Sequence, residues 1–388
     1  MSEWKEYKLG EICTELSDGL HKAPIFIEGG DYIFVNAKNI VNGFIVDNDP
    51  EKKSTYEEYL KYSSPLNETT ILYSIDGTIG NIALYRGEKC ILGKGACYIN
   101  PNPTIIDRLY LYYELQSPRF KAYIDRMSTG STIQHISLKT MRNYTFTSPS
   151  LTEQKRIASI LTSLDDKIDL LRRENATLEA MAETLFKQWF VVEAKEEWEE
   201  GKLGDILSVK GGTTPSTKEP SYWDGDVAWT SPRDITTLNG LYLFDTEKKI
   251  TQKGLEQISS GLLSEGTLLM SSRTPVGVLA FAEIPLAINQ GYIAILDDKG
   301  YSKEFIYLWL KTNMDLVHSY SNGSTFMEIS KSAFKSLDLL IPSQSEVEEF
   351  VGKVKPYFEK IRSNEMHCIL LFKLKNLLLP RLMSNKKY

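Results

Sequence analysis

Signatures of secretion, membrane insertion and disulfide bonding are scarce in this sequence of 388 residues. Its four cysteines form no CxxC pair and no cysteine–histidine spacing suited to a metal, so a reducing, cytoplasmic setting is expected. No charged-then-apolar leader opens the chain, and lysines interrupt the longest apolar runs. We therefore expect neither a secretory signal nor a membrane span.

Catalytic motifs are also missing. The sequence contains no GxxxxGK[ST] phosphate loop, no GxGxxG that opens a helix after a strand, and no HExxH. Its four histidines are scattered singly, which leaves little for a histidine-based triad. The paired carboxylates Asp165 and Asp166 are expected to be solvated charge. A binding or scaffold protein without cofactor or metal is therefore favoured over an enzyme.

A large basic block is absent as well, since the formal net charge is −6. An acidic balance argues weakly against a nucleic-acid-binding protein. Any contact with DNA must come from local clusters of basic residues or from a partner protein.

The longest regular pattern lies in residues 152–191, where apolar residues alternate in steps of four and three. This period of 3.5 residues is typical of a coiled-coil seam. About 40 residues make a helix of roughly 60 Å, with Thr152 as its expected N-cap. A narrow seam cannot bury itself, so a partner helix is predicted; the alternative is a long helix packed on a globular core. The seam comprises Ile157, Leu161, Leu164, Ile168, Leu171, Leu178, Ala182, Leu185 and Trp189, with Asn175 in the one polar slot.

Residues 346–383 are the expected partner helix. Pro356 lies inside this pattern and predicts a kink or a fresh helix start, and Pro380 is expected to end the helix. The seam falters at Glu365. Its apolar positions are Val347, Val351, Val354, Phe358, Ile361, Cys368, Leu371, Leu374 and Leu378.

The chain also repeats itself. Trp4-Lys-Glu-Tyr-Lys-Leu-Gly-Glu-Ile returns as Trp198-Glu-Glu-Gly-Lys-Leu-Gly-Asp-Ile, and VNAKNI (35–40) aligns with TSPRDI (230–235). Matches then fall at one constant separation, and a long helix follows in both copies. They pair Gly130-Ser131-Thr132 with Gly323-Ser324-Thr325, Ile136-Ser137 with Ile329-Ser330, Pro149 with Pro342, and Glu153 with Glu346.

Each copy has short β-rich runs broken by Gly, Pro, Asn and Ser, followed by a helical segment. The predicted fold class is therefore α/β, in an α+β arrangement. Two similar globular domains are joined by two long antiparallel coiled-coil helices, and an approximate twofold relates the copies. The predicted boundaries are a first domain at 1–150, a helix at 151–193, a second domain at 194–343 and a helix at 344–388.

Two motifs resemble a known family. EQKRIASILTSLDDKI with NATLEAMAETLFKQWF resembles the central conserved region of the specificity (S) subunits of type I restriction-modification systems, and LFKLKNLLLPRLMS resembles their second conserved region. The repeated WxxxKLGxI openings and the two Gly-Ser-Thr turns resemble the edges of the two target-recognition domains of that family. The resemblance covers essentially the whole chain.

The resemblance implies a non-catalytic DNA-recognition subunit. Each globular domain is expected to read one half of a split double-stranded DNA target, and the helices to set the spacing. Two methylase subunits, which use S-adenosylmethionine on adenine N6, are expected to bind the helices, and nuclease/translocase subunits to join through them. The alternative is a coiled-coil scaffold whose twin domains bind proteins.

Candidate DNA contacts are side chains able to reach base edges or phosphates from polar loops. Arg233 and Arg273 are the two arginines between 198 and 343 and are the leading candidates; the alternative is surface arginines paired with carboxylates. The loop from Lys210 through Thr213 is either a phosphate-tracking segment or a flexible connector, and the Gly-Ser-Thr turns are either contacts or caps. The selected residues are Lys22, Asn36, Lys38, Asn39, Lys94, Thr132, Gln134, Lys210, Thr213, Arg233, Arg273 and Thr325, and the favoured loops of the first domain also carry His21, Ser74, Asp76 and Thr78.

A second candidate site lies near the end of the first long helix. Phe186, Trp189 and Phe190 are more apolar than one seam requires. We expect them either to dock a methylase subunit or to brace the following domain. Asn175 is expected either to set the register of the helix pair from a buried position or to lie partly exposed at the edge of the seam.

Overall fold

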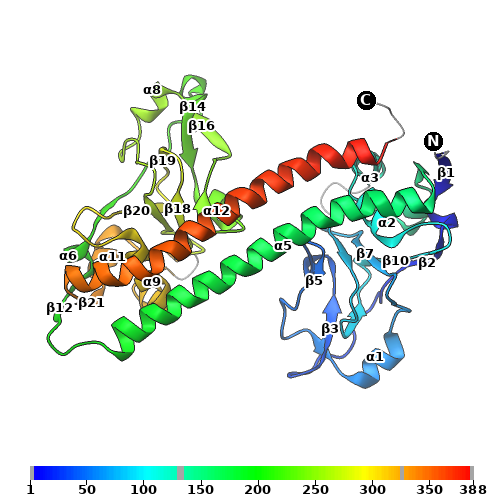
Figure 1. Ribbon diagram of the computed structural model, residues 1–388, viewed down its shortest axis with the longest axis horizontal. Helices are drawn as coiled ribbons and strands as arrows, with labels where there is room; N and C mark the ends of the chain where they lie inside the picture. Colours follow the sequence, from blue (N-terminus) through cyan, green and yellow to red (C-terminus); the bar gives the residue numbers. More distant parts are fainter. Residues whose placement is uncertain (1–3, 129–134, 324–326, 385–388) are drawn as a thin grey trace. The chain divides into compact units, whose positions relative to one another are not determined.

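The computed structural model describes residues 4–128, 135–323 and 327–384 (Figure 1). The chain divides into two compact units. Unit 1 contains residues 1–167 and 370–388, and unit 2 contains residues 168–369. These boundaries fall inside the two long helices, so each unit includes a stretch of both. The domain boundaries predicted at 150, 193 and 343 concern the ends of the globular parts and remain a prediction.

Unit 1 is built on a four-stranded antiparallel sheet with the order β2-β10-β7-β8. The central strands are buried throughout, which explains their continuous apolar runs in the sequence. A three-stranded sheet, β6-β3-β9, and the pairs β1-β11 and β4-β5 complete it. The strands are β1 (Lys5–Lys8), β2 (Cys13–Asp18), β3 (Tyr32–Val35), β4 (Ile40–Val41), β5 (Phe44–Ile45), β6 (Lys53–Ser54), β7 (Ile71–Ser74), β8 (Ile82–Leu84), β9 (Cys90–Leu92), β10 (Ala96–Pro101) and β11 (Thr145–Ser148).

The helices of unit 1 are short and begin at side-chain caps. They are α1 (Tyr56–Tyr62), α2 (Arg108–Glu114), α3 (Pro118–Met127) and α4 (Leu138–Arg142). Asp107, Ser117 and Ser137 cap α2, α3 and α4 by accepting a backbone N–H three residues on. Helix α2 buries Tyr110 and Leu111 in a core that the two long helices complete.

Unit 2 repeats this plan, which confirms the internal repeat predicted from the sequence. The order β13-β20-β17-β18 matches β2-β10-β7-β8, with β15 added at the edge, and β16-β14-β19 matches β6-β3-β9. The strands are β12 (Glu199–Lys202), β13 (Ser208–Lys210), β14 (Trp223–Thr230), β15 (Tyr242–Leu243), β16 (Lys248–Ile250), β17 (Leu268–Ser271), β18 (Leu279–Ala282), β19 (Leu286–Ile288), β20 (Tyr292–Leu296) and β21 (Asp338–Ile341).

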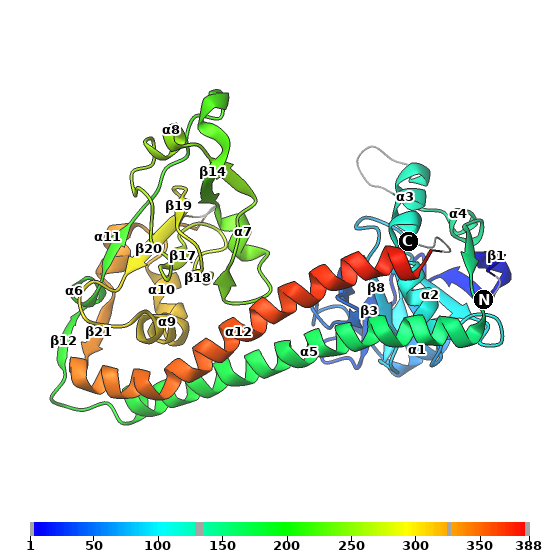
Figure 2. The ribbon, with the colours of Figure 1, turned by 45° about the horizontal axis from the view of Figure 1, so that its top comes forward.

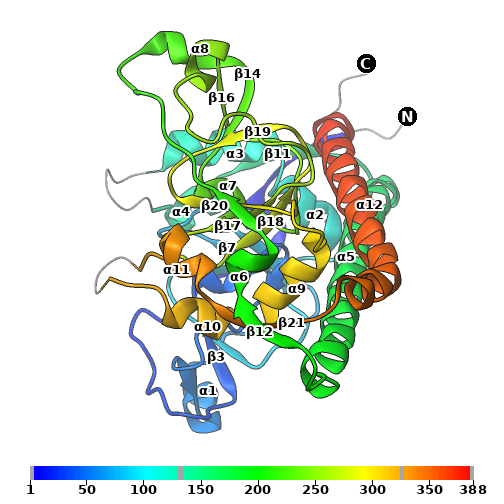
Figure 3. The same cartoon turned by 90° about the vertical axis from the view of Figure 1, so that its left-hand side faces the viewer.

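The helices of unit 2 follow the same order along the chain. They are α6 (Leu203–Ile206), α7 (Pro232–Thr236), α8 (Gln252–Leu255), α9 (Lys303–Thr312), α10 (Met314–Ser319) and α11 (Lys331–Lys335). Helix α9 lies between the sheet and the long helices, and it buries six consecutive residues from Phe305 to Leu310 (Figure 2). Strands β12 and β21 pair beside α6 (Figure 3).

The two long helices are α5 (Leu151–Lys187), which continues into a π-helical turn at Gln188–Val192, and α12 (Gln344–Leu382). Thr152 lies inside α5, so the predicted N-cap was wrong. Helix α12 passes through Pro356 and ends two residues beyond Pro380, so the fresh start at Pro356 and the helix end at Pro380 were predicted wrongly. Pro356 is exposed, and the carbonyl that its missing N–H leaves unpaired belongs to the exposed Gly352, where water can bind it. No helix in the described residues has the length and apolar content needed to cross a bilayer.

Within each unit, α5 and α12 contact each other through polar pairs as well as apolar ones. In unit 1, Lys375 Nζ lies 2.8 Å from both carboxylate oxygens of Asp165. In unit 2, Asn364 Nδ2 donates to Asn175 Oδ1 at 2.8 Å. Two predictions were therefore wrong: Asp165 is not simply solvated, and Leu374 is exposed while the adjacent Lys375 is buried.

Candidate nucleic-acid interface

Four loops of unit 1 meet at one end of its sheets, and we call them loop face 1: residues 19–22, 36–39, 75–81 and 93–95, with 135–136 alongside. Backbone hydrogen bonds connect the loops, from Lys94 N to Leu20 O at 3.0 Å and from Ile75 N to Gly95 O at 3.0 Å. The side chain of Asn81 donates to Ala37 O at 3.0 Å. The loops are therefore held as one surface.

Unit 2 carries the matching set, loop face 2: residues 212–214, 231–234, 272–277 and 289–291, with 328–329 alongside. Asn289 N donates to Thr230 O at 3.0 Å, and Ser272 N donates to Gly291 O at 2.8 Å. The last bond is the counterpart of the one between Ile75 and Gly95. The repeat therefore extends from the strands to the way the loops are joined.

The close approach of two chain segments at each face requires glycine. A Cβ on Gly19 would lie 2.1 Å from the carbonyl oxygen of Leu92, and a Cβ on Gly212 would lie 1.7 Å from that of Ile288. No side chain fits at either distance. These glycines bring the segments that follow β2 and β13 against the ends of β9 and β19.

Loop face 1 presents three of the predicted lysines to solvent. Lys22 is exposed, Lys38 pairs with Asp49, and Lys94 Nζ lies 3.5 Å from Asp76. Asn36 is half-buried, with its amide oxygen packed against Gly93. Exposed ion pairs of this kind contribute little to stability, so these cations can exchange a carboxylate for a phosphate or base.

Asn39 was wrongly chosen as a DNA contact. Its side chain is fully buried, accepts from Asn36 N at 3.0 Å, and donates to Val46 O and to Asn48 Oδ1. Because its hydrogen bonds hold the turn that carries Lys38, its role is structural. The sequence pattern could not separate it from Lys38 because the two are adjacent on the same polar turn.

Loop face 2 presents the two predicted arginines. Arg233 is 76% exposed, and its nearest carboxylate, Glu247, lies 3.9 Å away. It occupies the position of Lys38 in the repeat, on a turn that Asp234 fixes by accepting from Ser231 N at 2.8 Å. Arg273 Nε lies 3.1 Å from Glu328. Both arginines are therefore placed where DNA could reach them.

The remaining candidate DNA contacts of unit 2, Lys210 and Thr213, differ in exposure and in their hydrogen bonds. Lys210 is exposed and donates to Ser260 O at 3.4 Å. The Thr213 hydroxyl is engaged, since it donates to Gln257 O at 2.8 Å and accepts from Ser259 N at 3.1 Å. Thr213 therefore helps to fix its loop, and its hydroxyl is already engaged within the protein. Thr132, Gln134 and Thr325 lie outside the described residues.

Two residues on these faces were not selected from the sequence. His135 forms a β-bridge with Asp76, and Glu328 forms one with Arg273. A signal for them existed, because they directly precede Ile136 and Ile329, which the repeat aligns. The loop contacts that bring His135 and Glu328 to these faces could not be predicted from the sequence.

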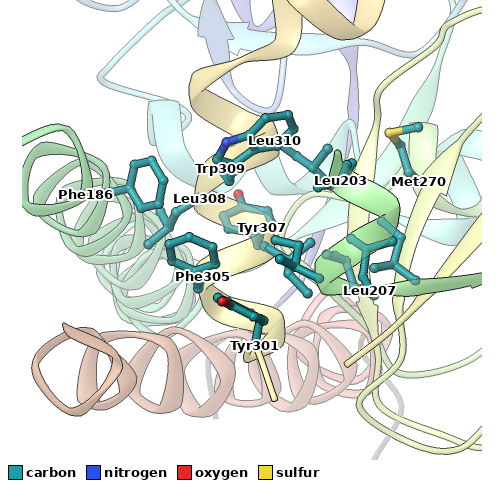
Figure 4. Close-up of a cluster of buried hydrophobic side chains, with 14 of the residues drawn as sticks. Phe186, Leu203, Leu207, Met270, Tyr301, Phe305, Tyr307, Leu308, Trp309 and Leu310 are labelled. Carbon is teal, nitrogen blue, oxygen red and sulfur yellow. The ribbon is translucent and has the colours of Figure 1, made fainter. Parts of the chain in front are cut away.

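Phe186 is only 1% exposed and belongs to the core of unit 2 (Figure 4). Its ring centroid lies 5.5 Å from that of Phe305 and 5.9 Å from that of Phe350. Phe190 packs on the same two rings, and Trp189 is half-buried against Phe350. The bracing alternative is therefore confirmed for Phe186, and a docking role for its side chain is wrong.

Comparison with known proteins identifies the family. The profile described as "Type I restriction modification DNA specificity domain" matches residues 1–180 and again 195–368. The chain belongs to this family. Each matched segment contains one of the loop faces and the start of one long helix. DNA sequence recognition is therefore its role, and the protein-binding scaffold is not favoured.

Individual relatives agree with this assignment. The MjaIX specificity subunit of Methanocaldococcus jannaschii is 35% identical over 185 residues, which is 47% of this chain and 43% of that protein. The HindI specificity subunit of Haemophilus influenzae is 23% identical over 466 aligned positions that cover both proteins fully. The chain thus spans less than half of MjaIX but all of HindI.

A solved structure shares the fold. The S subunit of a type I restriction-modification system from M. genitalium superposes with a TM-score of 0.58 at 18% identity, covering 100% of this chain and 97% of that one. Its similarity supports the mixed α/β, two-domain layout of this specificity subunit.

Proposed function

We propose that each loop face reads one half of a split DNA target. The observation that carries this proposal is the repetition of one glycine-anchored loop set with exposed cations, once in each segment that matches the DNA specificity family. Exposed lysines and arginines supply the phosphate contacts that dominate affinity, and arginine, asparagine and glutamine supply base contacts. The overall acidic charge requires that such contacts stay local.

We further propose that α5 and α12 form an antiparallel coiled coil that sets the spacing between the two half-targets. In unit 2, Asn175 faces Asn364 while Phe186, later on α5, faces Phe350, earlier on α12. In unit 1, Asp165 faces Lys375. Two readers on a rigid spacer meet the same face of DNA near one helical turn, roughly 34–36 Å, or a multiple of it.

The chain is proposed to be non-catalytic and to act with methylase subunits, two per chain, that modify adenine N6, and with nuclease/translocase subunits that join through them in the cytoplasm. With Phe186 buried, a different surface of the long helices must receive the methylase. Leu370, Leu374 and Leu377 share one face of α12 and are all exposed. Such a stripe on a long helix suits the apolar face of a partner helix.

Sequencing of methylated genomic DNA tests the recognition proposal. The subunit is co-expressed with its methylase in a host without adenine methylation, and a split motif is expected. Replacement of residues 198–343 by the same segment of a related subunit should change one half of the motif only. A change in both halves, or an unsplit motif, would contradict the proposal.

Pull-down of the methylase tests the docking surface. Replacement of Leu370 and Leu374 by serine should weaken methylase capture more than tenfold. The matched control is Leu60→Ser on α1, which is equally exposed but lies away from the long helices. Equal capture by both variants would remove this stripe as the docking surface.

A further inference from the structure

One position on the two loop faces has matching hydrogen bonds around it in both units but opposite charge. Asp76 in unit 1 and Arg273 in unit 2 each follow the strand at the centre of the larger sheet by two residues. Asp76 bridges to His135, and Arg273 bridges to Glu328. The acidic partner of one pair thus stands where the basic partner of the other stands.

Two hydrogen bonds of a serine side chain match at this position to within 0.1 Å. In unit 1, the Ser74 hydroxyl donates to Thr78 O at 2.6 Å and accepts from Asn81 N at 2.8 Å. In unit 2, the Ser271 hydroxyl donates to Pro275 O at 2.5 Å and accepts from Val278 N at 2.9 Å. These bonds fix the loop without the side chain of Asp76 or Arg273, so they require neither charge.

The bridging segment is anchored equally well. Ile136 N donates to Ile75 O at 2.9 Å, and Ile329 N donates to Ser272 O at 2.9 Å. By contrast, the neighbouring turn keeps one sign of charge in both units, with Lys38 in one and Arg233 in the other. The conserved sign fits a phosphate contact, which is the same for every sequence, and the reversed sign fits a base contact, which differs between half-targets.

Among the described residues, the groups at the reversed position keep donors and acceptors that no hydrogen bond occupies. Glu328 engages Nε of Arg273, and within the described chain neither terminal nitrogen of that guanidinium makes a hydrogen bond. The Asp76 carboxylate lies 3.5 Å from Lys94 Nζ and 4.0 Å from His135 Nδ1, and no described group hydrogen-bonds to it. One face therefore offers a fork of donors, and the other offers acceptors.

We propose that Asp76 and Arg273 are specificity-determining residues of the two half-targets, which deepens the DNA-recognition function proposed above and rests on it. In the major groove, two guanidinium donors match the O6 and N7 acceptors of guanine, and a carboxylate accepts from the N4 amino group of cytosine. Arg273 reads a guanine in the half-target of unit 2. Asp76 reads a cytosine in the half-target of unit 1, with Lys94 and His135 holding the carboxylate in place.

Altered-specificity variants test this inference. Glutamine and asparagine pair with the N6 and N7 groups of adenine, so Arg273→Gln and Asp76→Asn should each change one base of the motif toward adenine. Methylated sites are mapped by sequencing with the complete methylase complex, after the domain replacement has assigned each half to a unit. We expect the preference for the original base to fall about tenfold in one half only, with the other half unchanged.

Charge-matched controls separate base reading from general effects. Arg173→Gln removes an exposed arginine paired with Asp169, and Asp47→Asn removes a carboxylate paired with Lys53; both should leave the motif unchanged. A uniform loss of methylation at all four bases, a changed base in the wrong half, or an unchanged motif would overturn the inference and leave the proposed function standing. Absence of any split motif with the native subunit would overturn both.

Discussion

Unit 1 and unit 2 repeat the same strand order, yet they hold the long helices with different chemistry. Tyr113 on α2 donates to Asp165 on α5 in unit 1, and Tyr307 on α9 donates to Glu179 on α5 in unit 2. The balancing lysine differs in origin: Lys375 comes from α12 in unit 1, whereas Lys311 comes from α9 itself in unit 2.

Within unit 2, helix α12 is held by a different contact, the carboxylate of Glu365. Glu365 is buried and accepts from Leu241 N at 2.8 Å and Tyr242 N at 3.0 Å, at the start of β15. Both units therefore use a tyrosine and a carboxylate of α5, while the contact between each unit and α12 is specific to that unit. Changes at these contacts should affect one unit and spare the other.

The largest difference is expected from the apolar anchors. Phe186 in unit 2 and Leu379 in unit 1 occupy equivalent positions near the ends of the long helices, and both are buried. Phe186→Ala should destabilise unit 2 by about 3–5 kcal/mol, and Leu379→Ala should destabilise unit 1 by about 2–4 kcal/mol. Hydrogen exchange measured by mass spectrometry reports the units separately. The exposed Met181→Ala on α5 is the control, and equal protection losses in both units would break the comparison.

The next prediction concerns pH and unit 2 alone. Burial raises the pKa of Glu365 from 4.5 to about 7, with Glu179 and Glu283 nearby adding to the rise and two backbone N–H bonds opposing it. Between these values the folded glutamate keeps its proton while the unfolded one loses it. Stability should therefore fall as the pH rises from about 5 to 7, by up to about 3 kcal/mol.

Glu365→Gln sharpens this prediction, because the amide stays neutral and removes that part of the pH dependence. Urea unfolding and hydrogen exchange of unit 2 at pH 5 and pH 7.5 measure it, with the exposed Glu359→Gln on the same helix as the control. If the stability of Glu365→Gln fell with rising pH as steeply as that of the native protein, Glu365 would not titrate in this range.

The repeat and the two long helices could be predicted because they depend on periodic patterns that are local in the sequence. Asn175 was placed correctly in the helix contact for the same reason, and the structure adds that it is half-buried and faces Asn364. The loop faces were found only in part. Lys38 and Asn39 look equivalent in a polar turn, and their separation into an exposed cation and a buried structural amide depends on contacts with Val46 and Asn48.

The errors share one physical cause, which is a partner distant in the sequence. The periodicity placed Leu374 in the seam, but the adjacent Lys375 is buried instead, where Asp165 and the ring of Tyr113 compensate its charge. Glu365 interrupted the predicted seam. Its carboxylate oxygens accept from the backbone N–H groups of Leu241 and Tyr242, and helix periodicity carries no information about these distant partners. Burial of a charged residue is predictable only when its counter-group is known.

The charged contact of unit 1 should show an intermediate effect. Lys375→Ala leaves Asp165 and the Tyr113 hydroxyl without their cation, and we expect a loss of about 2 kcal/mol in unit 1, since Asp165 is partly exposed. Protection of unit 2 should be unchanged. The neighbouring exposed Lys373→Ala is the control, and an equal loss with this variant would mean that general charge, not the ion pair, is responsible.

The smallest effect is expected from the neutral polar pair of unit 2. Asn364 is fully buried, and its amide nitrogen donates to Asn175 at 2.8 Å and to Glu174 at 2.9 Å. Asn175→Leu leaves one acceptor in place, so it should cost about 1 kcal/mol or less. Replacing both asparagines by leucine removes the buried amide and should be neutral or stabilising.

The double leucine variant should no longer have a single register and oligomeric state, because a polar pair inside an apolar seam penalises shifted registers and other partners. Light scattering after size-exclusion chromatography should therefore detect higher oligomers of the double variant, and not of the exposed control Thr177→Leu. A double variant that is both more stable and strictly of native size would mean that Asn175 and Asn364 do not set the register. The register would then be set by Glu365 in unit 2 and by Lys375 in unit 1, which fix α12 by contacts that an apolar residue cannot replace.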